Sequence, residues 1–183
     1  MTDFFDTEAG KCAMVAKQFM EAALILEDTN LDARRRKIIF RPTLHLAGQG
    51  LELILKACIL WNGGKPPTSG KAGHDINGLW NDAKSEPVRR LAFSKAARVA
   101  EQDRASGDYP DVPPKDEILP MFKQAILRLG ELHGGQPYAL RYYSEPDPLA
   151  PRTPLLVKTL WHVSEDFVRN PRDFELSKFG SGA

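Results

Sequence analysis

The chain has 183 residues, which is enough for one domain with a substantial core, and we expect a single helical domain over residues 1–183. Its 25 Lys and Arg residues nearly balance its 24 Asp and Glu residues, which excludes a global electrostatic attraction to nucleic acid or to membranes. Two cysteines are too few for a disulfide scaffold, so Cys12 and Cys58 are expected to be reduced and buried.

The sequence predicts neither a secretion signal nor a membrane span. The N-terminal segment MTDFFDTEAGK is acidic and lacks the charged-then-apolar pattern of a signal peptide. Even the apolar run from Leu51 to Trp61 is interrupted by Glu52 and Lys56, and it is shorter than the roughly 20 residues that cross a bilayer. We therefore expect a cytoplasmic protein with no membrane partner.

The first predicted helix spans Asp6 to about Asp28. Apolar residues recur there at helical spacing, and Asp6 or Thr7 is placed to cap the first turn. The predicted apolar face consists of Cys12, Val15, Ala16, Phe19, Ala23 and Leu26. Four successive cations follow at positions 34–37, and we interpret them as a solvated turn or helix face, with a phosphate-binding patch as the alternative.

The second predicted helix, from Thr43 to Trp61, is apolar on nearly all sides. Pro42 is expected to end or kink whatever precedes it, and the glycines after Asn62 suit a left-handed C-terminal cap. One narrow polar strip holds Arg41, His45, Gln49, Glu52 and Lys56. We interpret this strip as a solvent-facing edge that carries a surface ion pair of Glu52 and Lys56, and the alternative is that it lines a groove.

Four further helices are predicted after an irregular segment rich in Gly and Pro. The first is short, starts after Asp75 and buries Ile76, Leu79 and Trp80, with His74 as part of its N-terminal cap. The others span about 86–106 with Ser85 as the cap, about 116–133, and from Thr153 to just before Asn170. The segment of about 134–154 should be ordered but irregular.

No stretch alternates convincingly enough to be a strand. The predicted fold class is therefore all-α, an up-and-down bundle of five or six helices.

One stretch of the chain, residues 41–80, resembles a known family. It contains Gly50-Leu51-Glu52-Leu53-Ile54-Leu55-Lys56-Ala57 and, after a loop, Gly73-His74-Asp75-Ile76 and Leu79. This pattern is similar to the HEPN family, the nucleotide-binding helical domains of higher eukaryotes and prokaryotes, in which a Glu-Leu-x-x-Lys-Ala helix precedes a Gly/Thr-His-Asp-Leu helix start. The resemblance implies a compact helical bundle that is often a homodimer.

The same resemblance implies two kinds of activity. Many HEPN proteins are metal-independent ribonucleases, some of them toxins neutralised by a nucleotidyltransferase-like partner, and others only bind or scaffold. Active members carry an Arg, four to six intervening residues and a His late in the bundle. Arg128 and His133 have this spacing, although Leu129 stands where active members usually carry a polar residue.

The chemistry of this pair suits RNA cleavage without a metal or cofactor. An imidazole can take the proton of a 2′-hydroxyl, and a guanidinium can hold two phosphate oxygens. The helical wheel nevertheless places His133 in the middle of the apolar stripe of its helix, which favours a packed histidine. The catalytic role of Arg128 and His133 is therefore the less favoured reading.

Other residues are candidates for ligand binding, and no residue set is predicted to hold a metal. His162 is expected to be exposed to solvent. Tyrosines with a neighbouring arginine could stack on bases, or could simply clamp an irregular segment onto the bundle. The candidate ligand-binding residues are His45, Gln49, Glu52, Lys56, His74, Arg141, Tyr142 and Tyr143.

The leading hypothesis is a HEPN-like module that binds RNA, a nucleotide or a protein partner, without evident catalysis. The alternatives are a metal-independent endoribonuclease that uses Arg128 and His133, and a structural protein-protein adaptor.

Overall fold

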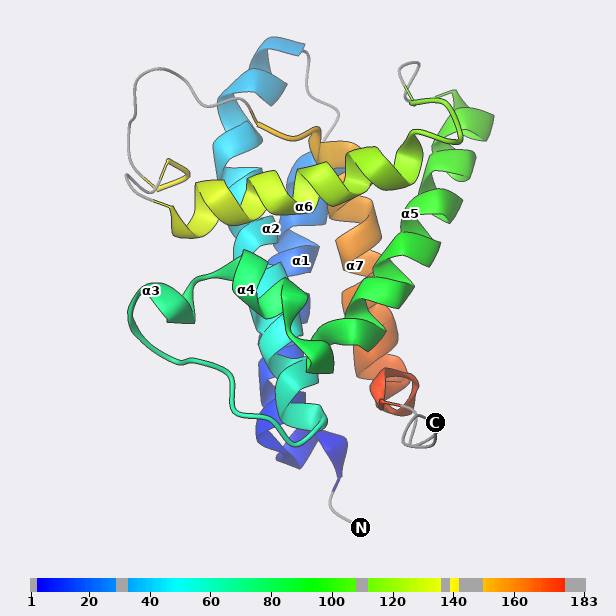
Figure 1. Ribbon diagram of the computed structural model, residues 1–183. Helices are drawn as coiled ribbons and strands as arrows, with labels where there is room; N and C mark the ends of the chain where they lie inside the picture. The colour runs from blue at the N-terminus through cyan, green and yellow to red at the C-terminus, as the bar shows by residue number, and fades with distance from the viewer. Residues whose placement is uncertain (1–2, 29–32, 108–111, 136–138, 142–149, 177–183) are drawn as a thin grey trace.

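The computed structural model describes residues 3–28, 33–107, 112–135, 139–141 and 150–176, with only the backbone of residues 33–38 (Figure 1). These residues form seven α-helices and no strand, which confirms the predicted all-α fold. The helices are α1 (Glu8–Asp28), α2 (Ala33–Trp61), α3 (Gly70–Gly73), α4 (Ile76–Asn81), α5 (Glu86–Ser106), α6 (Ile118–Gly134) and α7 (Thr153–Arg169). Three 3₁₀ turns accompany them, η1 (Phe4–Asp6), η2 (Ala83–Ser85) and η3 (Pro171–Phe174).

Figure 1 shows α1, α2 and α7 running side by side, with α5 flanking α7 and α6 crossing the three at a steep angle. The crossing brings the C-terminal end of α6 onto α2, next to the short helix α4. As a result, residues of the central helix meet residues that are about half the chain away in sequence.

The core lies around α2, as its apolar composition predicts. Leu44, Leu51 and Leu55 are fully buried, and so are the apolar stripes of α6 and α7, which consist of Ile118, Phe122, Ile126 and Leu129 and of Leu156, Leu160, Val163 and Phe167. By length and composition, Ile39–Trp61 is the one helical stretch among the described residues that could cross a membrane, although the sequence analysis found none. Since 67% of its most apolar part is buried, packing within the fold accounts for its apolar composition.

The predicted apolar face of α1 is partly wrong. Val15 is 42% exposed, whereas the buried face consists mainly of alanines together with Met20. Small residues let α1 approach α2 closely, since a Cβ at Gly50 would lie 2.4 Å from Met20 Sδ. Alanines contribute little to a hydrophobic periodicity. The prediction therefore followed the larger apolar residues, which lie partly on a neighbouring face of α1.

Several predicted helix ends are confirmed. Asp75 accepts a hydrogen bond from Gly78 N, Thr7 Oγ1 accepts one from Gly10 N, and Gly63 ends α2 with a φ of 69°. Ser85 is different, because it is buried at the start of α5 and makes no side-chain cap hydrogen bond. The segment predicted to be wholly irregular before His74 also contains one helical turn, α3.

The two cysteines are free thiols, as predicted, but only Cys58 is fully buried. Burial raises the pKa of Cys58 to about 12 and that of half-buried Cys12 to about 11, so both stay protonated near neutral pH. His162, which was predicted to be exposed, is half-buried, with its ring edge-on to Trp161 at 4.9 Å. Most of the segment of about 134–154 and the side chains of the cationic run at 34–37 lie outside the described residues.

The start of α2 differs most from the prediction. The helix begins at Ala33, nine residues before Pro42, and continues through the proline. A proline within a helix donates no backbone hydrogen bond and crowds the preceding turn. Thr43 Oγ1 donates a hydrogen bond to Ile39 O at 2.9 Å, and this bond links the residues before and after the proline. Packing of the α2 core therefore outweighs the local preference to stop.

We predict that Pro42→Ala raises the free energy of unfolding by about 1–3 kcal/mol, because Pro42 is an exposed proline inside a helix. Pro154→Ala is the matched control, since Pro154 lies in the first turn of α7, where a proline is tolerated. Urea unfolding followed by circular dichroism measures both variants. Equal effects of the two substitutions would contradict the helix continuing through Pro42.

Candidate functional site

The central feature of the site is the carboxylate of Glu52, which lies on α2 and is only 3% exposed. Its Oε1 accepts a hydrogen bond from Lys56 Nζ at 2.6 Å, one helical turn away. Its Oε2 lies 2.9 Å from His133 Nε2 and 3.1 Å from His74 Nδ1. We call Glu52, Lys56, His74 and His133 the glutamate cluster.

Close packing of α6 on α2 positions His133. The residue lies at the C-terminal end of α6, and its side chain is fully buried. Its ring lies directly over Gly48, where an added Cβ would be 2.6 Å from Nδ1 and 3.0 Å from Cγ. A rigid imidazole cannot move aside as a flexible chain could, so glycine at position 48 is what lets the ring reach Glu52.

His74 reaches the cluster from the turn between α3 and α4. Its backbone N–H donates to Lys71 O at 3.2 Å, and the next residue, Asp75, caps α4. Its carbonyl packs against Gly134 at the end of α6, where an added Cβ would lie 2.4 Å from that oxygen. The side chain of His74 is 41% exposed, so it forms the solvent-accessible side of the cluster.

The hydrogen bonds keep Glu52 ionised. Burial alone would raise the pKa of its carboxyl group, because a charge is unstable away from water. The hydrogen bonds from the two histidines and from Lys56 outweigh burial and lower this pKa to about 2. A permanent negative charge is thus held inside the bundle and surrounded by three donor side chains.

A second layer of basic residues lies beside the cluster. His45, one turn before Gly48, stacks on His133 with ring centroids 6.0 Å apart. Burial, His133 and Arg141 lower the pKa of His45, which places the Arg141 guanidinium in its neighbourhood. Arg41 Nη1 donates to Ala139 O at 3.4 Å, so the turn at 139–141 lies along the first part of the polar strip.

A comparison with protein families agrees with the all-α fold. The family model described as HEPN domain matches residues 16–126, which is more than half of the chain. The chain belongs to the HEPN family. No curated protein and no solved structure matches it. Membership relates the chain to helical modules associated with nucleotides and RNA.

Most candidate ligand-binding residues of this HEPN chain lie at one site. His45, Gln49, Glu52 and Lys56 share one side of α2, and His74 and Arg141 join them from other segments. The interpretation of the strip as a solvent-facing edge is wrong for Glu52 and Lys56, whose side chains are 4% and 12% exposed. Asp75 caps α4 as predicted, whereas the side chain of His74, which was predicted to be part of the same cap, contacts Glu52 instead. Tyr142 and Tyr143 lie outside the described residues.

The structure does not bring Arg128 and His133 together. His133 packs inside the bundle, as its place on the apolar stripe indicated, although its partner is a carboxylate. The Arg128 side chain is 40% exposed and pairs with Glu131 at 2.7 Å. It lines a cavity of about 540 Å³ with residues of α6 and of the start of α7, on a different side of α6.

Three groups of the cluster also form a set of metal-ligand types that the sequence analysis did not find. Glu52 Oε2, His74 Nδ1 and His133 Nε2 all lie within 4.8 Å of one another. Spacing could not reveal them, because the residues come from α2, a turn and α6. The available signal was the small number of histidines, since two of the four in the chain contact this carboxylate and a third, His45, stacks on His133.

We predict that Glu52→Gln lowers the free energy of unfolding by about 2–4 kcal/mol, because it leaves Lys56 and two histidines without their buried anion. Glu131→Gln is the matched control, since it removes an equivalent but exposed ion pair and should cost less than about 1 kcal/mol. Denaturant unfolding of both variants tests this. A Glu52→Gln protein as stable as the control would mean that the cluster does not stabilise the fold.

Proposed function

We propose that this HEPN module binds the phosphates of RNA or of a nucleotide at the basic face around Glu52. The observation that carries the proposal is that five basic side chains from three separate segments lie along the polar side of α2, two of them bonded to the buried carboxylate of Glu52. We call these side chains the basic face, and they are Arg41, His45, Lys56, His74 and Arg141.

The charges on this face favour an anionic ligand. Glu52 is one negative charge, it is buried, and Lys56 together with the two histidines already satisfies it. The exposed part of the face presents His74 and Arg141 to solvent. Guanidinium and imidazole groups are common phosphate ligands, and a guanidinium can bind two phosphate oxygens at once.

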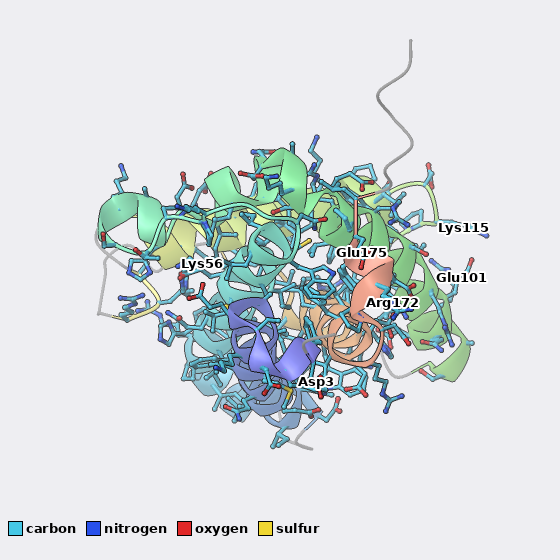
Figure 2. All side chains as sticks on the ribbon, turned by 90° about the horizontal axis from the view of Figure 1, so that it is seen from below. Asp3, Lys56, Glu101, Lys115, Arg172 and Glu175 are labelled. Atoms are coloured by element: carbon cyan, nitrogen blue, oxygen red, sulfur yellow. The ribbon has the colours of Figure 1, made fainter. Side chains whose placement is uncertain are left out.

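Because the total charge of the chain is near neutral, an attraction to RNA has to come from the local arrangement of charges. Figure 2 shows Lys56 on the side of the molecule away from Glu101 and Lys115. On that distant side Lys115 pairs with Glu101 at 3.0 Å, and its side chain is 81% exposed. Replacing Lys115 by a neutral residue changes the net charge as much as replacing a cation of the basic face, but leaves that face intact. Such a substitution therefore offers a matched control.

We predict that Arg141→Gln weakens binding of a fluorescein-labelled single-stranded oligoribonucleotide and makes the slope of log affinity against log salt shallower by about one. Lys115→Gln should leave both quantities at the wild-type values. Fluorescence anisotropy in EDTA at several salt concentrations measures them. Equal behaviour of the two variants would exclude this face as the RNA site, and no binding by the wild type at low salt would favour the adaptor hypothesis.

The endoribonuclease alternative rests on the spacing of Arg128 and His133. It predicts that the pure protein cuts RNA in EDTA to 2′,3′-cyclic phosphate ends, and that His133→Ala abolishes the cleavage. Mass spectrometry of the products identifies those ends. Arg128→Ala should have the same effect, whereas Arg90→Ala, at an exposed position of α5, should have none. Cleavage that survives His133→Ala would contradict the assignment.

We also propose that the module forms a homodimer, which has a specific role in the endoribonuclease alternative. A second copy could supply an arginine to the cluster, which Arg128 of the same chain does not reach. A nucleotidyltransferase-like protein would be the partner if the chain is the toxin of a toxin-antitoxin pair.

A further inference from the structure

We propose that Glu52, His74 and His133 form a binding site for a zinc ion, a role beyond the phosphate binding proposed above and independent of it. Two imidazoles and one carboxylate are a ligand set that zinc accepts, and with three protein ligands the fourth position is left for water or another ligand. The three donor atoms lie within 4.8 Å of one another.

Two of the three donor–donor distances require only a small adjustment, and the third, between His74 Nδ1 and His133 Nε2, is within 4.8 Å. Tetrahedral zinc with arms of about 2.0–2.1 Å holds its ligand atoms roughly 3.3 Å apart. Glu52 Oε2 is 2.9 Å from His133 Nε2 and 3.1 Å from His74 Nδ1, so both distances would lengthen by a few tenths of an ångström. His74 can supply that movement, because it lies in a turn and is partly exposed. Glu52 and His133 are held by helices α2 and α6.

The carboxylate is prepared for a metal on one oxygen only. Lys56 binds Oε1, while the two imidazole nitrogens converge on Oε2. The lysine therefore orients the carboxylate without occupying the oxygen that would bind the ion, as an outer-shell partner does in many metal sites. Its positive charge also lowers the attraction for a second cation, so we expect an exchangeable ion rather than a permanently held one.

The cluster is also not saturated as a hydrogen-bond network. His133 is 1% exposed, yet in the part of the chain that the structure describes its Nδ1 has no hydrogen-bond partner. Buried imidazole nitrogens without partners are uncommon in networks that serve stability alone. Nε2 carries the ring proton in its hydrogen bond to Glu52, so an ion bound at Nε2 would move that proton to Nδ1.

Access to the ion would be from the side of His74, since Glu52 and His133 are closed off from solvent. The open coordination position therefore faces the basic face. An ion there would add positive charge where phosphates are proposed to bind, but its own binding requires no RNA.

The test is titration of tag-free, metal-free protein with Zn²⁺ by isothermal calorimetry, with Co²⁺ as a probe whose visible absorption reports tetrahedral coordination. We expect one ion per chain. His74→Ala should weaken the Zn²⁺ affinity by at least about 100-fold, because even the loss of an outer-shell partner costs roughly 10–100-fold. His162→Ala is the matched control, since it removes a half-buried histidine outside the cluster and should bind as the wild type does.

Circular dichroism shows whether His74→Ala remains folded, and Glu52→Gln provides a second variant that should lose the cobalt spectrum. No zinc binding by the wild type, or unchanged affinity in His74→Ala, would overturn the proposal. Because zinc is titrated without RNA and RNA binding is measured in EDTA, each proposal can fail without the other.

Discussion

The structure depends on a charge that is buried in its central helix. Glu52 is held within the apolar and mostly buried stretch of α2 from Ile39 to Trp61, and a carboxylate in that position is tolerated only with partners that replace water. Those partners come from one helical turn away, from the α3–α4 turn and from the end of α6. The steep crossing of α6 over α2 in Figure 1 is thus tied to a polar contact as well as to apolar packing.

The helices could largely be predicted from the sequence because their ends carry local signals. Asp75 and Gly63 fulfil the cap roles that their residue types indicated, and α5 has the predicted bounds. Local rules failed where tertiary packing prevailed. Pro42 does not end a helix whose following turns are buried on most sides, and the alanines of α1 form a buried face that few large apolar residues mark.

The candidate site could be predicted only in part. The polar strip of α2 identified Glu52 and Lys56, but local periodicity could not show which side of a nearly apolar helix is covered. His133 contacts Glu52 across 81 positions, a distance that no spacing rule encodes. Arg128 illustrates the converse, because residues five apart on a helix point about 140° from each other, and the motif spacing alone does not make them neighbours. Family membership therefore supports the fold more firmly than it supports any catalytic pair.

Gly48 has a consequence for the comparison of sequences. Its missing side chain provides the space in which the His133 ring lies, so the two positions should vary together among relatives of this chain. A relative with a larger residue at position 48 cannot place a histidine in this way, even if its sequence retains the arginine-histidine spacing. Glycine at position 48 is therefore a better marker of the HEPN chains that share this arrangement than the histidine itself.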